Sequence, residues 1–157
     1  MTDHETLFLE EDSVILLKDL VEQFAAESTL PEIFDSRMDF DGFSSVLKDL
    51  MTRDLADVIV TIDEQMMPIG VLIFTATPNL FTGDIEAREL VWYVKPEYRG
   101  TRIAFDLFKA FEISAVDDFN ARLLIMTHLE VSMPEKLKKV YERRGYQLLE
   151  TNYMKRV

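Results

Sequence analysis

The sequence contains no cysteine, which excludes disulfide bonds, thiolate nucleophiles and cysteine metal ligands. It has only two histidines, His4 and His128, and they stand far apart, so no metal-ligand cluster is indicated. No apolar run approaches the roughly 20 residues of a membrane-spanning helix. The N-terminal stretch MTDHETLFLEED is acidic and lacks the basic region and apolar core of a secretory signal. We therefore expect a cytoplasmic protein that binds neither a metal ion nor a membrane.

Basic residues are also scarce, since 17 Lys and Arg stand against 29 Asp and Glu, for a net charge of −12. Residues 1–64 hold 17 acidic and 4 basic residues, whereas residues 134–157 hold 3 and 7. A nucleic-acid footprint needs a basic face, so nucleic-acid binding is disfavoured. The acidic half is either an ordinary solvated surface or a field that attracts cationic substrates such as amines.

What is present indicates a globular protein, with 157 residues of which 48% are apolar. No internal repeat or Ser/Gly/Pro-rich linker interrupts the chain, so we expect a single domain over 1–157. The first half predicts a short strand at 7–12, a helix from Ser13 to about Glu27, and a second helix capped by Asp41. Pro31 breaks the pattern between the two helices.

From residue 57 the spacing of apolar residues changes to the two-residue alternation of strands. DVIVTI at 57–62 and the segment 69–76 predict an antiparallel pair, and EARELVWYV at 86–94 predicts a third strand after a loop at 78–85. A helix at about 104–119, a strand at 121–129 and a helix at 134–144 follow, with short strands at 146–150 and 153–157. The order β-α-α-β-β-β-α-β-α-β-β predicts an α/β fold with a mixed, mostly antiparallel sheet. Residues 86–129 should form one parallel crossover.

The stretch VKPEYRGTRIAFDLFK, 94–109, joins a strand to a helix. A helix N-terminus carries unpaired N–H groups and partial positive charge, which suit a phosphate. Gly100 permits close approach to the backbone, and Arg99 and Arg102 add cationic donors. By itself the stretch is equally consistent with an ordinary turn that carries exposed arginines.

The order of elements and the segment ELVWYVKPEYRGTRIAFDLF resemble the GNAT-type N-acetyltransferase superfamily. Its acyl-CoA loop follows an Arg/Gln-x-x-Gly-x-Gly/Ala pattern, in which Arg99 matches the first position and Ala104 the last. Arg102 stands where the superfamily usually has glycine. Its side chain is tolerated there if the backbone is helical and the side chain points outward. KKVYERRGYQLLE at 138–150 is similar to the last helix and strand, although Pro134 replaces the usual Asn.

The resemblance implies direct transfer of an acetyl group from acetyl-CoA to an amine, without a metal. Backbone groups of the strand at 90–94 would contact the pantetheine arm and stabilise the oxyanion. Tyr141 would protonate the departing thiolate. Glu89 is the expected base, with Glu86 as its competitor. The implied cofactor-binding residues are Trp92, Tyr93, Val94, Arg99, Gly100, Thr101, Arg102, Ile103, Ala104 and Tyr141.

The resemblance implies two alternative functions. The first is an N-acetyltransferase for a primary amine of a small cationic molecule, a protein or a peptide. The second is a catalytically degraded GNAT-fold binding module that acts through a protein partner, with Arg102 and Pro134 marking the lost site. Homodimers are common in the superfamily, so the resemblance is also compatible with a homodimer.

Overall fold

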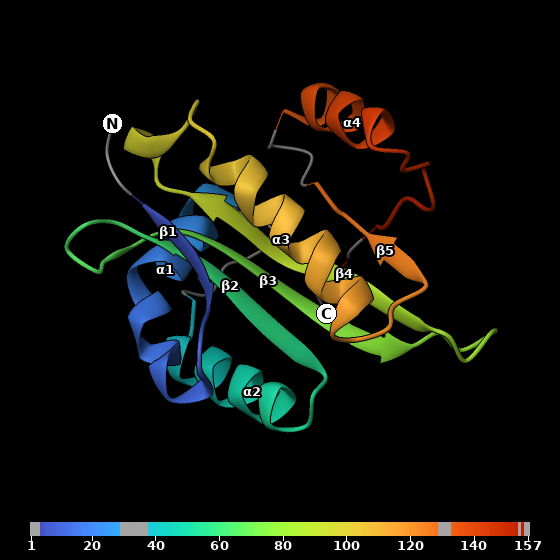
Figure 1. The fold of residues 1–157 in the computed structure, drawn as a ribbon, viewed down its shortest axis with the longest axis horizontal. Helices are drawn as coiled ribbons and strands as arrows, with labels where there is room; N and C mark the ends of the chain where they lie inside the picture. Colours follow the sequence, from blue (N-terminus) through green and yellow to red (C-terminus); the bar gives the residue numbers. More distant parts are fainter. Residues whose placement is uncertain (1–3, 29–37, 129–132, 154, 156–157) are drawn as a thin grey trace.

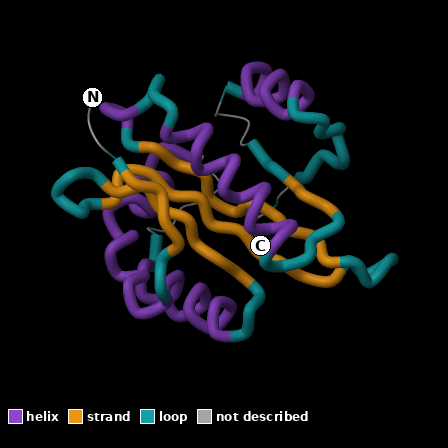
Figure 2. Tube along the Cα trace, viewed as in Figure 1, coloured by secondary structure: helices purple, strands orange, loops and turns teal. Residues whose placement is uncertain are grey.

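The computed structural model describes residues 4–28, 38–128, 133–153 and 155. Five strands form one sheet in the order β1-β2-β3-β4-β5 (Figures 1 and 2). The strands are β1 (Glu5–Phe8), β2 (Ala56–Ile62), β3 (Pro68–Pro78), β4 (Ile85–Val94) and β5 (Leu123–Ile125). The first four pair antiparallel and β4 pairs parallel with β5, so the predicted mixed α/β fold and its parallel crossover are confirmed.

Helices cover both faces of the sheet (Figure 1). The 3₁₀ helix η1 (Glu11–Leu17), α1 (Lys18–Ser28) and α2 (Phe40–Thr52) pack on one face with Val58, Val60 and Val71. On the other face, α3 (Ile103–Asp117) and α4 (Pro134–Arg143) pack with Ile59, Leu72 and Phe74. The inner strands β2 and β3 read as near-continuous apolar runs because both of their faces are buried.

Several predicted boundaries shift in the first half. The first strand ends at Phe8, because residues 11–17 form η1 instead of extended chain. The cap of α2 is Asp39 rather than Asp41, since the Asp39 carboxylate accepts a hydrogen bond from Gly42 N–H at 3.0 Å. The break predicted at Pro31 lies outside the described residues.

The prediction of two C-terminal strands is wrong for the described residues 146–153, which form no strand. Leu148 and Leu149 are adjacent and both exposed, so this segment lacks the alternation that buries one face of a strand. Most of the second predicted strand, 153–157, lies outside the described residues. The strand predicted at 121–129 shortens to β5, and residue 129 is likewise outside them.

A bulge divides β4 into two halves. Phe74 of β3 pairs with Glu89 and Ile73 pairs with Val91, so Leu90 is an extra residue without a partner on β3. Before the bulge, Ala87 faces the α3 side of the sheet, whereas Val91 and Tyr93 after it face α1 and α2. Odd-numbered side chains of β4 therefore face the α3 side before the extra residue and the α1 and α2 side after it.

Candidate active site

The edge of β4 is open over its second half. Parallel pairing with β5 joins only Glu86, Ala87 and Arg88, whereas β4 continues to Val94. Within the described residues, no strand pairs with the β5-side edge of 89–94. Main-chain N–H and C=O groups on such an edge can bind an extended ligand.

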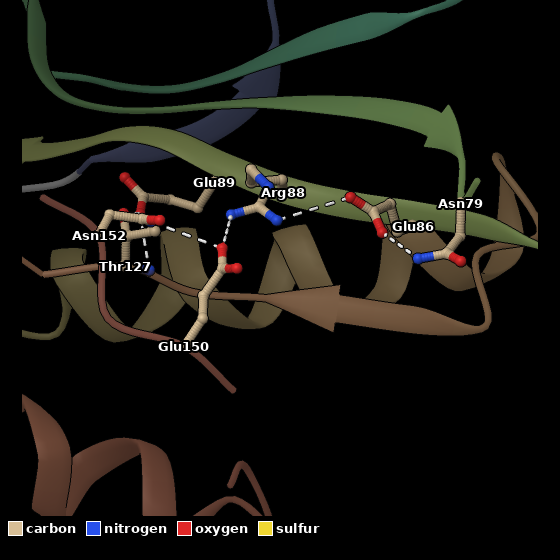
Figure 3. A network of polar contacts seen from close by, with 7 residues as sticks. All are labelled: Asn79, Glu86, Arg88, Glu89, Thr127, Glu150 and Asn152. Carbon is tan, nitrogen blue, oxygen red and sulfur yellow. Dashed lines mark hydrogen bonds and ion pairs between the residues drawn. The ribbon is translucent and has the colours of Figure 1, made fainter. Parts of the chain in front are cut away.

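Glu89 lies where this opening begins. Its side chain is buried, with only 5% exposure, and one carboxylate oxygen accepts two hydrogen bonds from Thr127. The main-chain N–H donates at 3.2 Å and the hydroxyl at 2.7 Å (Figure 3). Burial raises the pKa of Glu89 to about 6, and the bonds from Thr127 oppose that rise. A carboxyl with this pKa is mostly ionised at pH 7 and can accept a proton.

Glu86, the competing base candidate, is held elsewhere. It accepts a hydrogen bond from the Asn79 amide at 2.8 Å and pairs with Arg88 at 3.6 Å. Arg88 also pairs with Glu150 at 3.5 Å, so these side chains form one surface network (Figure 3). Its carboxylate oxygens are already engaged by Asn79 and Arg88, which favours Glu89 over Glu86 as the base.

Tyr141 reaches the same residue from α4. Its hydroxyl donates to the main-chain carbonyl of Thr127 at 2.7 Å. Burial, and after it the negative charge of Glu89, raises the pKa of Tyr141 above its usual value. The hydroxyl therefore keeps its proton at neutral pH, as a proton donor must.

Tyr141 belongs to an aromatic cluster of four residues, together with Trp92, Phe108 and Tyr146. The ring centroids of Trp92 and Phe108 are 5.3 Å apart, and Phe108 lies 6.0 Å from Tyr141 and 5.8 Å from Tyr146. Arg144 lies over Phe108, with 5.0 Å from its guanidinium carbon to the ring centroid, and pairs with Glu112. These contacts fix α4 against α3 and hold Tyr141 beside the sheet.

The loop before α3 has a geometry that suits an anion. Gly100 has φ 81°, and no heavy atom outside its chain neighbours lies within 4 Å of the position of a Cβ. The Thr101 hydroxyl donates to the carbonyl of Tyr98 at 2.7 Å. Arg102 caps α3 in a helical conformation, φ −74° and ψ −13°, with 82% of its side chain exposed. The side chain therefore points outward, as cofactor binding was expected to require, and its guanidinium pairs with Asp106 of α3 at 3.4 Å. The Ile103 N–H donates to the Thr101 hydroxyl at 3.4 Å.

Arg99 is placed differently from the rest of the loop, because its guanidinium turns toward α1. Nε donates to the carbonyl of Val94 at 2.9 Å, and one terminal nitrogen donates to Glu27 at 2.7 Å. The guanidinium also lies over the ring of Tyr93, whose hydroxyl donates to Glu27 at 2.5 Å. Burial alone would raise the pKa of Glu27, but the bonds from Tyr93 and Arg99 outweigh it and lower that pKa.

The fold thus brings together only some of the residues that the sequence indicated. Glu89, Trp92 and Tyr141 meet on the α3 and α4 side, whereas Tyr93 and Arg99 face α1. Val94, Ile103 and Ala104 pack in the core beneath the loop. The sequence did not indicate Thr127, which links Glu89 to Tyr141. The only signal for it was a hydroxyl residue directly after the apolar run LLIM.

Comparison with known proteins finds no match to a family model and none to a curated sequence. Solved structures do match over nearly the whole chain. A ribosomal-protein-alanine N-acetyltransferase from Brucella melitensis biovar Abortus superposes with a TM-score of 0.74 at 19% identity, covering 99% of this chain and 100% of that one. A predicted acetyltransferase from Clostridium acetobutylicum, solved with acetyl-CoA, gives 0.70 at 16% identity, covering 96% of each chain.

An aminoglycoside N-acetyltransferase solved in complex with CoA gives a TM-score of 0.75 at 12% identity, covering 100% of this chain and 96% of that one. The chain therefore has the GNAT-type N-acetyltransferase fold. Among the described residues, no group of three or more acidic, His or Cys side chains is placed to hold a metal ion. The helices of the described part are too short or too polar to cross a membrane.

Proposed function

We propose that this protein is an N-acetyltransferase that transfers an acetyl group from acetyl-CoA to a primary amine. The observation that carries the proposal is the contact of Glu89 and Tyr141 with one residue, Thr127, beside the open edge of β4. A buried carboxylate and a protonated hydroxyl thus both contact the residue at which β5 leaves β4, where an extended arm could pair with main chain. This combination suits acyl transfer to an amine.

The residues present fit acetyl-CoA, which supplies the activated acetyl group as a thioester. Main-chain N–H groups from Gly100 to Ala104 would bind its pyrophosphate, with Arg102 nearby as an exposed cation. Main-chain groups of Trp92 and the N–H of Val94 would pair with the pantetheine arm, whereas those of Tyr93 face β3 in the ladder. Arg99 takes part by fixing the loop, since Glu27 and the Val94 carbonyl already bind its side chain.

The chain's own groups would then handle the protons. The acceptor amine must be neutral to attack, and the carboxylate of Glu89 would take its proton, directly or through a water. The hydroxyl of Tyr141 would donate a proton to the departing sulfur after turning from the Thr127 carbonyl. A main-chain N–H of the open edge would stabilise negative charge on the carbonyl oxygen.

The acceptor is proposed to be a primary amine of a small cationic molecule or of a protein. The strongly acidic residues 1–64 favour a cation over an anion. Two of the structural neighbours are named for such acceptors, an aminoglycoside and a ribosomal-protein alanine.

The test combines binding with turnover. Saturating acetyl-CoA should raise the melting temperature of the protein. Thiol release should then be measured with a panel of polyamines, aminoglycosides and peptides with free N-termini, and one class should accelerate it. Absence of a melting shift with acetyl-CoA excludes the proposed function.

The second candidate is a GNAT-fold binding module that does not catalyse transfer. It is favoured by the contact of Arg99 with Glu27, which already occupies the guanidinium of the loop. A melting shift without turnover on any amine, together with a stable complex with another protein, supports this candidate. Turnover of any acceptor rules it out.

A further inference from the structure

Trp92 is the only tryptophan of the chain, and it lies beside the proposed catalytic pair. It belongs to the part of β4 beyond Arg88, where pairing with β5 has ended. Its ring centroid is 5.3 Å from that of Phe108 on α3 and 6.4 Å from that of Tyr141 on α4. The indole therefore stands in the same aromatic cluster as the proposed proton donor.

The indole N–H is buried, and it has no hydrogen-bond partner within the part of the chain that the structure describes. The nearby tyrosine hydroxyls differ in this respect. Tyr93 donates to Glu27, Tyr141 donates to the Thr127 carbonyl, and Tyr146 donates to Glu112. An unpaired buried donor destabilises a folded protein, so its presence beside a binding edge indicates a partner that arrives with a ligand.

The chemistry of the indole limits what this ligand group can be. Nε1 carries a proton and has no lone pair to offer, so its partner must be an acceptor. The pantetheine arm of acyl-CoA carries amide carbonyls, and acylation adds a thioester carbonyl. An arm that pairs with the open edge of β4 would pass the side chains of that strand.

We propose that the Trp92 indole N–H donates a hydrogen bond to a carbonyl oxygen of the acyl-pantetheine arm. This inference rests on the proposed function and adds a side-chain ligand to the main-chain groups of β4. Trp92 thereby becomes a binding residue that selects ligands with the arm over the bare adenosine nucleotide.

Fluorescence of the single tryptophan tests the contact directly. Titration with acetyl-CoA should change the emission of Trp92, whereas the adenosine nucleotide portion of CoA, which lacks the arm, should not. An equal response to that nucleotide overturns the inference. A response to both CoA and acetyl-CoA assigns an amide carbonyl, and a response to acetyl-CoA alone assigns the thioester carbonyl.

The substitution Trp92→Phe separates this role from packing. It keeps an aromatic ring in the cluster and removes only the donor and part of the ring area. We expect the dissociation constant for acetyl-CoA, measured by calorimetry, to rise about tenfold, as for one lost hydrogen bond. The melting temperature of the free protein should fall only by what the lost ring area costs, because the deleted donor was unpaired.

Tyr146→Phe is the matched control from the same cluster. Its hydroxyl is paired with Glu112 at 3.3 Å, so this variant should lose thermal stability and keep its affinity for acetyl-CoA. If Trp92→Phe binds acetyl-CoA as tightly as the wild type, the inference is wrong and the proposed function stands. If the wild-type protein does not bind acetyl-CoA, both are wrong.

Discussion

Glu89 and Thr127 are joined by two hydrogen bonds to one carboxylate oxygen, one from a main-chain N–H and one from a hydroxyl. The pair fixes the point where β5 leaves β4, because the chain after Ile125 bonds to the Glu89 side chain instead of continuing the ladder. The same two bonds set the acidity of Glu89. Burial raises its pKa, and Thr127 limits the rise to about 6.

Acetyl transfer should therefore lose activity as the pH falls through about 6, because only ionised Glu89 accepts a proton. Glu89→Gln should lower kcat/KM by about 10² to 10⁴-fold and remove this acidic limb. The measurement is a pH profile of thiol release. Glu86→Gln is the control, since Glu86 belongs to the Asn79 and Arg88 network and its loss should leave the limb in place.

Thr127→Val should move the acidic limb of this profile to higher pH. Valine has nearly the shape of threonine but lacks the hydroxyl that stabilises ionised Glu89. The main-chain bond from residue 127 would remain. A limb that stays at the wild-type pH in this variant would show that Glu89 is not the group that titrates.

Glu89 should also make stability depend on pH. Its folded pKa of about 6 lies above its ordinary value of 4.5, so the folded protein binds this proton more tightly than the unfolded chain. The stabilisation from protonated Glu89 is complete below pH 4.5 and is lost as the pH rises through 6. The free energy of unfolding of Glu89→Gln, relative to that of the wild type, should thus increase by up to about 2 kcal/mol between pH 4 and pH 8. Urea unfolding of both proteins at several pH values measures this difference, and a constant difference contradicts it.

Tyr141→Phe should lower kcat with little change in the dissociation constant for acetyl-CoA. The ring stays in the aromatic cluster, while the hydroxyl that donates to the Thr127 carbonyl is removed. The lost hydrogen bond should reduce the free energy of unfolding by about 1 kcal/mol. Thiol release and calorimetry together test the role, and a wild-type kcat would exclude Tyr141 as the proton donor.

Gly100→Ala should weaken acetyl-CoA binding and destabilise the fold by about 1 kcal/mol, since φ 81° is strained for any residue with a Cβ. Gly83→Ala is a matched control. Gly83 also has positive φ, 74°, and an equally open surrounding, but it lies in the loop between β3 and β4. The two variants should lose similar stability in urea, and only Gly100→Ala should bind acetyl-CoA less tightly.

Replacing the two arginines of the loop should have different effects on stability and on affinity for acetyl-CoA. Arg99→Gln should cost about 1 kcal/mol of stability, a small value because the Arg99–Glu27 pair is nearly half exposed. Arg102→Gln should change stability little, because its pair with Asp106 at 3.4 Å leaves the Arg102 side chain 82% exposed and such pairs contribute little. It should weaken acetyl-CoA binding by a few-fold, and more at low salt than at high salt. If Arg102→Gln binds acetyl-CoA as tightly as the wild type at every salt concentration, Arg102 does not contact the phosphates.

The sequence predicted the elements of the fold better than the contacts of the site. Apolar periodicity located β2, β3, β4 and α3 to within two residues, because their buried faces decide their sequence pattern, and Pro134 located the start of α4. The segment 146–150 was misread as a strand, since an apolar pair such as Leu148–Leu149 does not say whether a partner strand exists. Gly145, with φ 87°, did mark the end of α4 as its position indicated.

The site depended on two features that a pattern cannot show. Thr127 meets Glu89 only because parallel pairing brings β5 beside β4, so the contact is a product of the fold. Arg99 matched a phosphate-loop position, yet the nearby Glu27 and Tyr93 bind its side chain. Spacing in the sequence indicated which residues belong to the loop, but not which way each side chain turns.

The unpaired Leu90 has a consequence for how this chain can change over time. Deleting that one residue would restore strict alternation and leave Trp92 and Tyr93 in the layers into which they point, because Glu89 and Val91 already pair with the adjacent residues Phe74 and Ile73. Neither layer would need to repack, and Leu90 itself is 46% exposed. A single codon can therefore remove the bulge while the packing of both layers is kept, so deletion of Leu90 should be better tolerated than deletion of a residue further along the strand.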